Sequence, residues 1–252
     1  MIKMNINKKI LFLIRLIRNP RDIFSICQYI FFDKNITYRE RINVIIKFLN
    51  ISYYVDCPHK QHEILEFIKE VSRVPKDTKG VIIEAGCYKG GSSSKFSIVS
   101  KYLNRDFIIF DSFEGMPENN EPHAKNIFGG SASFPKGKYC GKYDEVKENI
   151  NQYGEIEKCT LIKGWFSETL PQFNEPIIAA YIDVDLVSST KECLKYIFPL
   201  LQPNSVLISQ DGHLPLVLEV FNDKKFWENE LGIKRPRIEK IGRGKLIKVT
   251  KA

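Results

Sequence analysis

The stretch that decides the fold is VIIEAGCYKGGSSS, residues 81–94. Its first four residues, three apolar ones and Glu84, show no polar alternation, which is typical of a strand covered on both faces of a parallel sheet. The glycines that follow allow a sharp turn, and the serines at 92–94 favour the start of a helix, whose free N–H groups can bind a ligand. The stretch therefore predicts a strand, a ligand-binding turn and a helix in direct succession.

Similar apolar runs recur downstream of this stretch at the intervals of a β-α-β chain. They are residues 107–111, 160–163, 177–183 and 206–209. Residues 237–249 have apolar positions on both sides of Gly242-Arg243-Gly244, which predicts a terminal hairpin or edge strands. We therefore expect a doubly wound, mostly parallel α/β sheet, of the Rossmann-like kind, within residues 76–252.

The part of the chain before this sheet, residues 1–75, has the apolar periodicity of helices. Helices are expected at residues 10–17, after Thr37 and at 59–74. The first 21 residues have six basic side chains and no acidic one, so docking of an amphipathic helix on its own protein and contact with a membrane surface both stay open. We expect an N-terminal helical cap or interaction region.

One connection within the sheet region is unusually long. About 48 residues separate Asp111 from the strand near Thr160, whereas loops in such folds usually have roughly 2–6 residues. Residues 117–143 are rich in Gly, Pro, Asn and Lys, which favours an irregular segment over the ligand face. We expect an insertion at about 115–150 that encloses the substrate.

Composition excludes several classes of protein. The chain has 252 residues, of which 43% are hydrophobic and 27% charged, which is typical of a globular protein and not of a collagen-like or disordered chain. Its 38 basic and 30 acidic side chains give a net charge of +8. This charge permits binding to nucleic acid or acidic lipid without requiring either.

Cysteine spacing and hydropathy bear on the compartment. The six cysteines include no CxxC pair, which gives no support for a zinc knuckle and favours a reducing compartment. The apolar run at 10–17 contains Arg15 and is far shorter than the roughly 20 residues of a membrane-spanning helix. We expect a cytoplasmic protein.

The glycine turn and the end of the next strand indicate a nucleoside cofactor. The spacing from Gly86 to Gly90 does not satisfy the GxGxxG pattern of dinucleotide-binding turns, which weakens an NAD interpretation. Asp111 lies 21 residues after Gly90, near the spacing at which an acid accepts hydrogen bonds from ribose hydroxyls. A purely structural turn and a capping Asp are the alternatives, but the combination favours ribose binding.

Carboxylates follow two neighbouring strands of the expected sheet. Asp183 and Asp185 end one strand, and Asp211 ends the next. Because these strand ends meet at one edge, the carboxylates would repel each other unless protons or a hard cation such as Mg²⁺ lay between them. The alternative is that Asp185 caps the helix that starts near Ser188.

Five sequence blocks, in order, resemble the macrocin O-methyltransferase family over roughly residues 60–230. The blocks are EAGCYKGGSS, FDSFEGMP, KGWFSETLP, YIDVDLVSST and SQDGHLP. The resemblance implies a class I methyltransferase fold, a bound S-adenosylmethionine (S-adenosyl-L-methionine) and a Mg²⁺-assisted methyl transfer to a hydroxyl of a sugar or polyol.

The resemblance also implies a set of cofactor-binding residues on three turns. They are Glu84, Gly86, Tyr88 and Gly90 on the methionine side, Asp111 and Ser112 at the ribose, and Trp165 and Phe166 at the adenine. An aromatic side chain just after a strand can stack on a purine, although a core position explains the two aromatic residues equally well.

The metal ligands implied by the same resemblance are Asp183, Asp185, Gln210 and Asp211. Family members have a paired acid where this chain has Gln210 followed by Asp211. This departure predicts either weaker metal binding or a neutral ligand oxygen from Gln210. Asp183 and His213 are the candidate catalytic bases. His59 and His62 belong to the cap and could touch the substrate, but a solvated face of the cap is the stronger expectation for both.

Two other classes of function stay open. One is a nucleotide-dependent oxidoreductase on a similar sheet, and the other is a catalytically inactive module that binds a membrane surface or nucleic acid. The expected partner is a small-molecule hydroxyl acceptor and not nucleic acid, because the chain has no RNA-binding motif. The identity of that acceptor and assembly into a homo-oligomer are not determined by these patterns.

Overall fold

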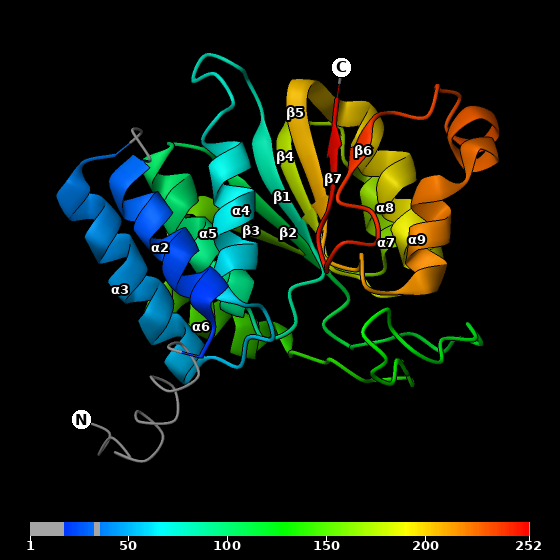
Figure 1. Ribbon diagram of the computed structural model, residues 1–252, viewed down its shortest axis with the longest axis horizontal. Helices are drawn as coiled ribbons and strands as arrows, with labels where there is room; N and C mark the ends of the chain where they lie inside the picture. The colour runs from blue at the N-terminus through cyan, green and yellow to red at the C-terminus, as the bar shows by residue number, and fades with distance from the viewer. Residues whose placement is uncertain (1–17, 33–35, 252) are drawn as a thin grey trace.

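The computed structural model describes residues 18–32 and 36–251 and contains a seven-stranded sheet (Figure 1). Its strand order is β3-β2-β1-β4-β5-β7-β6. The strands are β1 (Val81–Ala85), β2 (Phe107–Asp111), β3 (Cys159–Lys163), β4 (Ile177–Ile182), β5 (Leu201–Ser209), β6 (Ile238–Glu239) and β7 (Ile247–Thr250).

The first five strands are parallel, and the last two form an antiparallel edge. From β1 the chain moves outward to β2 and β3, and then returns to β4 on the other side of β1 and continues to β5. In open sheets of this kind, ligands bind at the carboxyl ends of the strands where the order reverses. The predicted doubly wound sheet and the terminal hairpin are confirmed.

Helices cover both faces of the sheet (Figure 1). One face carries α2 (Pro20–Phe32), α3 (Tyr38–Tyr54), α4 (Gln61–Val71), α5 (Gly91–Tyr102) and α6 (Tyr143–Tyr153). The other face carries α7 (Phe166–Thr169), α8 (Val187–Leu200) and α9 (Pro215–Asn222). Short helical turns are η1 (Ile156–Lys158), η2 (Leu170–Gln172) and η3 (Phe226–Glu230). No helix in the described ranges has the length and apolarity needed to cross a membrane.

The central strands have apolar side chains on both faces because each face packs against helices. Ile82 of β1 belongs to the core under α2–α6, and its neighbour Ile83 belongs to the core under α8 and α9. Burial of each such side chain contributes roughly 1.5–3 kcal/mol. The lack of polar alternation in residues 81–85 is therefore a consequence of this double burial.

The cap helices share the core of the sheet. Helix α3 begins after Thr37, whose side chain accepts a hydrogen bond from Glu40 N while Glu40 Oε2 accepts from Thr37 N at 2.8 Å. Helix α2 was not among the expected helices, although Pro20 suits a first helical turn because it needs no hydrogen-bond partner there. The helix expected at residues 10–17 lies outside the described residues.

The long connection after β2 is irregular from residue 112 to residue 142, apart from an isolated bridge between Lys125 and Ser131. Residues 143–150, which the predicted insertion included, belong instead to α6, the crossover helix that leads to β3. Glu121 attaches the segment to the start of α8, because its carboxylate accepts hydrogen bonds from Val187 N at 2.7 Å and Ser188 N at 2.9 Å. Residues 112–142, hereafter the insertion, thus lie at the carboxyl ends of the strands.

Candidate active site

A cavity whose empty space, with its open mouth included, is about 910 Å³ lies at the carboxyl ends of the parallel strands. Most of its wall comes from turns after strands and from the insertion, and Pro58 of the cap, Ser189 of α8 and Lys245 before β7 complete it. The wall includes Gly86 after β1, Asp111 at the end of β2, Gly164 after β3, Asp183 after β4 and Gln210 after β5, together with Met116 and Tyr139 of the insertion. The cavity therefore occupies the place that the reversal of strand order favours for a ligand.

The turn after β1 requires glycine at Gly86. This residue has φ +85°, and a Cβ atom there would lie 2.0 Å from the backbone oxygen of Asp183. The close approach brings the turn against the end of β4, and Tyr88 follows on the cavity wall. Gly90, with φ +77°, is the N-cap of α5 and does not line the cavity.

Glu84 lies behind the turn and not on the cavity wall. Its side chain is fully buried and accepts a hydrogen bond from Ser93 Oγ in the first turn of α5. Burial raises the pKa of Glu84 to about 8, although hydrogen bonds from Ser92 and Ser93 oppose this shift. The structure thus gives Glu84 a role in joining β1 to α5, and no direct contact with the cavity.

Asp111 joins the ends of β1 and β2. One carboxylate oxygen accepts a hydrogen bond from Cys87 N and the other from Phe113 N, both at 2.7 Å. Burial raises the pKa of Asp111, although these backbone hydrogen bonds oppose the shift. Each oxygen keeps a further lone pair, so the carboxylate can also accept hydrogen bonds from two hydroxyls. Ser112 lies beside it on the cavity wall.

Trp165 and Phe166 lie on the same cavity wall after β3, and both side chains are half-buried. Gly164 N donates a hydrogen bond to Asp111 O at 3.0 Å, which holds this turn against the end of β2. An aromatic surface next to the carboxylate suits a purine ring joined to a ribose. Six of the eight expected cofactor residues therefore line one cavity, and Glu84 and Gly90 support its wall from behind.

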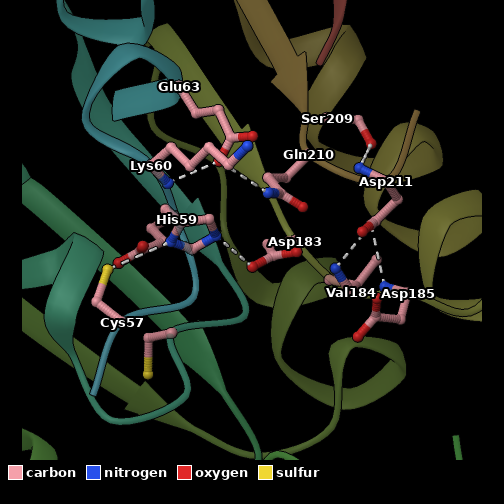
Figure 2. A network of polar contacts seen from close by, with 12 residues as sticks. Cys57, His59, Lys60, Glu63, Asp183, Val184, Asp185, Ser209, Gln210 and Asp211 are labelled. Carbon is pink, nitrogen blue, oxygen red and sulfur yellow. Dashed lines mark hydrogen bonds and ion pairs between the residues drawn. The ribbon is translucent and has the colours of Figure 1, made fainter. Parts of the chain in front are cut away.

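Three carboxylates converge on the other side of the cavity. Asp183, Asp185 and Asp211 each offer an oxygen, and these three oxygens lie within 4.8 Å of one another. Asp211 Oδ2 accepts hydrogen bonds from Val184 N and Asp185 N at 3.0 Å each (Figure 2). Asp211 Oδ1 is buried and has no hydrogen-bond partner among the described residues. This group of three is named the carboxylate cluster.

The electrostatics of the carboxylate cluster are unfavourable without a cation. Burial, followed by the charge of Asp183, raises the pKa of Asp185 to about 8. Burial, with the charges of Asp185 and Asp183, also raises the pKa of Asp211 well above its ordinary value. Like charges held this close retain protons unless an opposite charge replaces them.

Gln210 stands beside the carboxylate cluster and is nearly fully buried. Its Nε2 atom is 3.5 Å from Glu63 Oε2, and the same Glu63 oxygen accepts a hydrogen bond from Lys60 N at 2.8 Å. Figure 2 shows the amide oxygen of Gln210 directed away from Glu63. The residue therefore presents a neutral oxygen at the position where the resemblance gives family members a paired acid.

The two candidate bases lie at the same cavity. His213 lines it, and its backbone oxygen accepts a hydrogen bond from Ile127 N of the insertion at 2.9 Å. The ring of Phe128 stacks near that of His213, with centroids 6.5 Å apart. Burial, together with the charge of Lys245, lowers the pKa of His213, so its ring is suited to accept a proton.

The sequence interpretation was wrong for His59. Its side chain is only 4% exposed, and its Nε2 atom lies 2.7 Å from Asp183 Oδ2. Burial lowers the pKa of His59, but the charge and hydrogen bond of Asp183 outweigh this and hold the pKa well above its ordinary value. The same contact outweighs burial at Asp183 and lowers the pKa of that carboxyl.

His62 lies elsewhere on the cap and is also not simply solvated. Its Nδ1 atom is 2.6 Å from Asp22 Oδ1, which ties α4 to α2. The expected residues Asp183, Asp185, Gln210 and His213 therefore line one cavity. Asp211 is fully buried and contributes an oxygen close to those of Asp183 and Asp185 from behind the wall, as His59 supports Asp183.

The sheet order and the cavity define a class I methyltransferase-type fold, and solved methyltransferases have the same fold. The O-methyltransferase NovP superposes with a TM-score of 0.60 at 18% identity, covering 75% of this chain and 78% of NovP. The calicheamicin methyltransferase CalS11 gives 0.60 at 19% identity over 92% and 91% of the two chains. The Podospora anserina methyltransferase PaMTH1, solved with bound SAH, gives 0.52 at 13% identity over 82% and 86%.

The family follows from the sequence. The pattern of the macrocin-O-methyltransferase family (TylF) matches residues 59–241, and the chain belongs to this family. A relative from Streptomyces olivaceus, 8-demethyl-8-(2,3-dimethoxy-alpha-L-rhamnosyl)-tetracenomycin-C 4'-O-methyltransferase, is 28% identical over 177 residues. That match covers 66% of this chain and spans 64% of the length of the relative.

Proposed function

We propose that this protein transfers a methyl group from S-adenosylmethionine to a hydroxyl of a sugar or polyol-type intermediate, with the assistance of Mg²⁺. The main support is the composition of the cavity. The same cavity has a carboxylate and an aromatic surface suited to a nucleoside on one side, and the carboxylate cluster on the other. A methyl donor and a hydroxyl acceptor held there would be adjacent, which lowers the entropic cost of their reaction.

The residues on the nucleoside side suit the cofactor. Asp111 can accept hydrogen bonds from the ribose hydroxyls, and Trp165 and Phe166 can contact the adenine. The turn at Gly86 lets the backbone approach the methionine portion closely. The SAH bound to PaMTH1, a protein of the same fold, supports this choice of cofactor. The missing GxGxxG spacing argues against the oxidoreductase alternative.

The carboxylate cluster fits a divalent cation. Its donors are all oxygen atoms, which Mg²⁺ prefers, and the buried Asp211 Oδ1 atom has no other partner among the described residues. Asp183, Asp185 and Asp211 would hold the ion, and Gln210 would add a neutral oxygen. A bound Mg²⁺ lowers the pKa of an acceptor hydroxyl and fixes its direction.

The proposed reaction forms a bond between the acceptor oxygen and the methyl carbon while the carbon–sulfur bond breaks. The hydroxyl proton must leave at the same time, and Asp183 or His213 takes it as the general base. Asp183 has the lowered pKa of a carboxylate that stays charged, and His213 has the lowered pKa of a neutral ring.

The choice of a sugar acceptor comes from the family. The Streptomyces olivaceus relative is named for transfer to the 4'-oxygen of a rhamnosyl group. The insertion supplies Met116 and Tyr139 to the cavity wall, so residues of this segment would select the acceptor. The six cysteines are free thiols, which suits the reducing cytoplasm as the site of the reaction.

Calorimetric titration and a turnover assay test the proposed function together. S-adenosylhomocysteine should bind the unaltered chain, and Asp111→Ala should weaken that binding severely. With labelled S-adenosylmethionine and a panel of deoxysugar nucleotides and glycosides, Mg²⁺ should stimulate methyl transfer, and Asp211→Ala should abolish the stimulation. Unchanged cofactor binding in Asp111→Ala would contradict the ribose assignment, and full activity in excess chelator would exclude the role of Mg²⁺.

A further inference from the structure

We propose that His59 is a positioning residue for Asp183. Its ring fixes one oxygen of that carboxylate and so directs the other oxygen toward the acceptor and the metal ion. The inference rests on the proposed function, because it concerns how the cap prepares the carboxylate cluster for its ligand. His59 belongs to the cap, outside the sheet. It does not follow a strand, as the aspartates of the carboxylate cluster do.

His59 and Asp183 are in contact, but only Asp183 is on the cavity wall. His59 Nε2 lies 2.7 Å from Asp183 Oδ2, and the side chains of the two residues are 4% and 20% exposed, respectively. Asp183 lines the cavity, whereas His59 does not. The ring therefore stands behind the carboxylate and cannot contact a substrate directly. A hydrogen bond of this length between charged groups has strong directional preference.

The ring of His59 is itself held in place (Figure 2). Its Nδ1 atom is 3.7 Å from Cys57 Sγ, so both ring nitrogens have partners. The ring meets the Tyr181 ring edge-on, with centroids 5.8 Å apart and an interplanar angle of 88°. Behind it, Lys95 Nζ of α5 donates to Cys57 Sγ at 3.8 Å. Because the ring is held in place, its hydrogen bond limits rotation of the Asp183 carboxylate.

The carboxylate cluster needs such support because its members repel one another. Two backbone N–H groups hold Asp211, whereas the ring of His59 holds Asp183. Without that ring, Asp183 could rotate away from Asp185 and Asp211 and lower the repulsion, at the expense of the metal site. Partners behind metal ligands commonly contribute roughly 10–100-fold to metal affinity or activity.

Three substitutions separate positioning from packing. His59→Gln keeps an amide N–H that can reach Asp183, and His59→Asn has the same amide on a side chain shorter by one methylene group. His59→Leu removes the donor and keeps apolar volume. His59→Gln and His59→Asn have the same amide group and differ only in its reach. Comparing these two variants therefore tests positioning even if His59→Leu fails to fold.

The measurement is Mn²⁺ binding to the full chain, followed by electron paramagnetic resonance, with S-adenosylhomocysteine titrated in parallel. His59→Asn and His59→Leu should bind Mn²⁺ about 10–100-fold more weakly, and His59→Gln should stay within about threefold of the unaltered chain. S-adenosylhomocysteine should bind all four chains equally well, because Asp111 and its turn do not contact His59.

Two results would overturn the inference and leave the proposed function intact. They are Mn²⁺ binding of normal strength in His59→Asn and His59→Leu, and a loss in His59→Gln as large as in His59→Leu. A third result is different in kind: an unaltered chain that binds S-adenosylhomocysteine but no Mn²⁺ would remove the metal role from the proposed function, and the inference with it.

Discussion

Asp111, at the end of β2, accepts a 2.7 Å hydrogen bond from the backbone nitrogen of Cys87, in the turn after β1. Residues 82–85 of β1 pair with residues 107–110 of β2, so this hydrogen bond continues the pairing and holds the glycine turn against the carboxylate. A cofactor bound there would contact both parts without ordering either. Preorganisation of this kind increases affinity because binding then costs less conformational entropy.

Asp111→Asn should weaken S-adenosylhomocysteine binding at least about tenfold, because hydrogen bonds to a charged group contribute roughly 1.5–3 kcal/mol. The amide has a single acceptor oxygen and cannot satisfy both Cys87 N and Phe113 N. Calorimetric titration measures the loss, with Glu175→Gln, at an exposed position, as the matched control. Equal affinities in the two variants would show that Asp111 does not bind the cofactor.

Mg²⁺ should raise the Tm of the chain through the carboxylate cluster. A ligand present at 100 times its Kd stabilises a folded protein by about 2.7 kcal/mol. Asp211→Asn should cancel this effect, because it removes charge and one carboxylate oxygen from the site. Thermal melts with and without Mg²⁺ measure the shift, and Glu175→Gln should retain it. An Mg²⁺-induced shift that persists in Asp211→Asn would locate the ion elsewhere.

Glu84 should make the stability of the ligand-free chain fall between pH 5 and pH 8. Its pKa is about 8 in the folded chain against an ordinary value of 4.5, so the folded state binds the extra proton in this window. The free energy of unfolding should therefore decrease by up to about 1.4 kcal/mol per pH unit from this group.

Glu84→Gln removes that titration and should be more stable than the unaltered chain at pH 8, with little difference at pH 5. Urea unfolding at the two pH values measures the change, and the amide can still accept the hydrogen bond of Ser93. If the stability difference between the two chains were the same at both pH values, the side chain would not titrate in this window.

Glu121→Ala should loosen the insertion. The carboxylate accepts hydrogen bonds from Val187 N, Ser188 N and Ser188 Oγ at the start of α8, where a negative charge also interacts favourably with the helix dipole. Hydrogen exchange should become faster in residues 119–134, while S-adenosylhomocysteine affinity should stay the same. Glu118→Ala, at an exposed position of the same segment, is the control. Equal exchange rates in the two variants would show that Glu121 does not hold the insertion in place.

The sheet was predictable because its strands are buried on both faces. An uninterrupted apolar run such as residues 107–110 is typical of a strand covered on both faces of a parallel sheet. The start of β5 was not predicted, since Leu201–Ser209 includes Pro203 and Asn204, which are typical of loops and have exposed side chains here. Helix α2 was missed for a related reason, because the polar residues before it resemble the end of a helix.

The convergence of Asp183, Asp185 and Asp211 follows from a topological rule, since parallel strands bring their carboxyl ends to one edge. No such rule applies to His59, which reaches Asp183 across 124 positions of sequence. Its place depends on how α4 packs over β4, and a single histidine before a helix carries no signal of that packing. The same is true of Glu63 and its contact with Gln210.

The most direct test of the proposed function is a crystal structure of the chain with S-adenosylhomocysteine and Mn²⁺, with the ion located by anomalous scattering. We expect the ribose hydroxyls on Asp111 and one Mn²⁺ ion bound by Asp183, Asp185 and Asp211 in the same structure. A ligand bound away from Asp111, or an ion that these carboxylates do not bind, would contradict the proposed function.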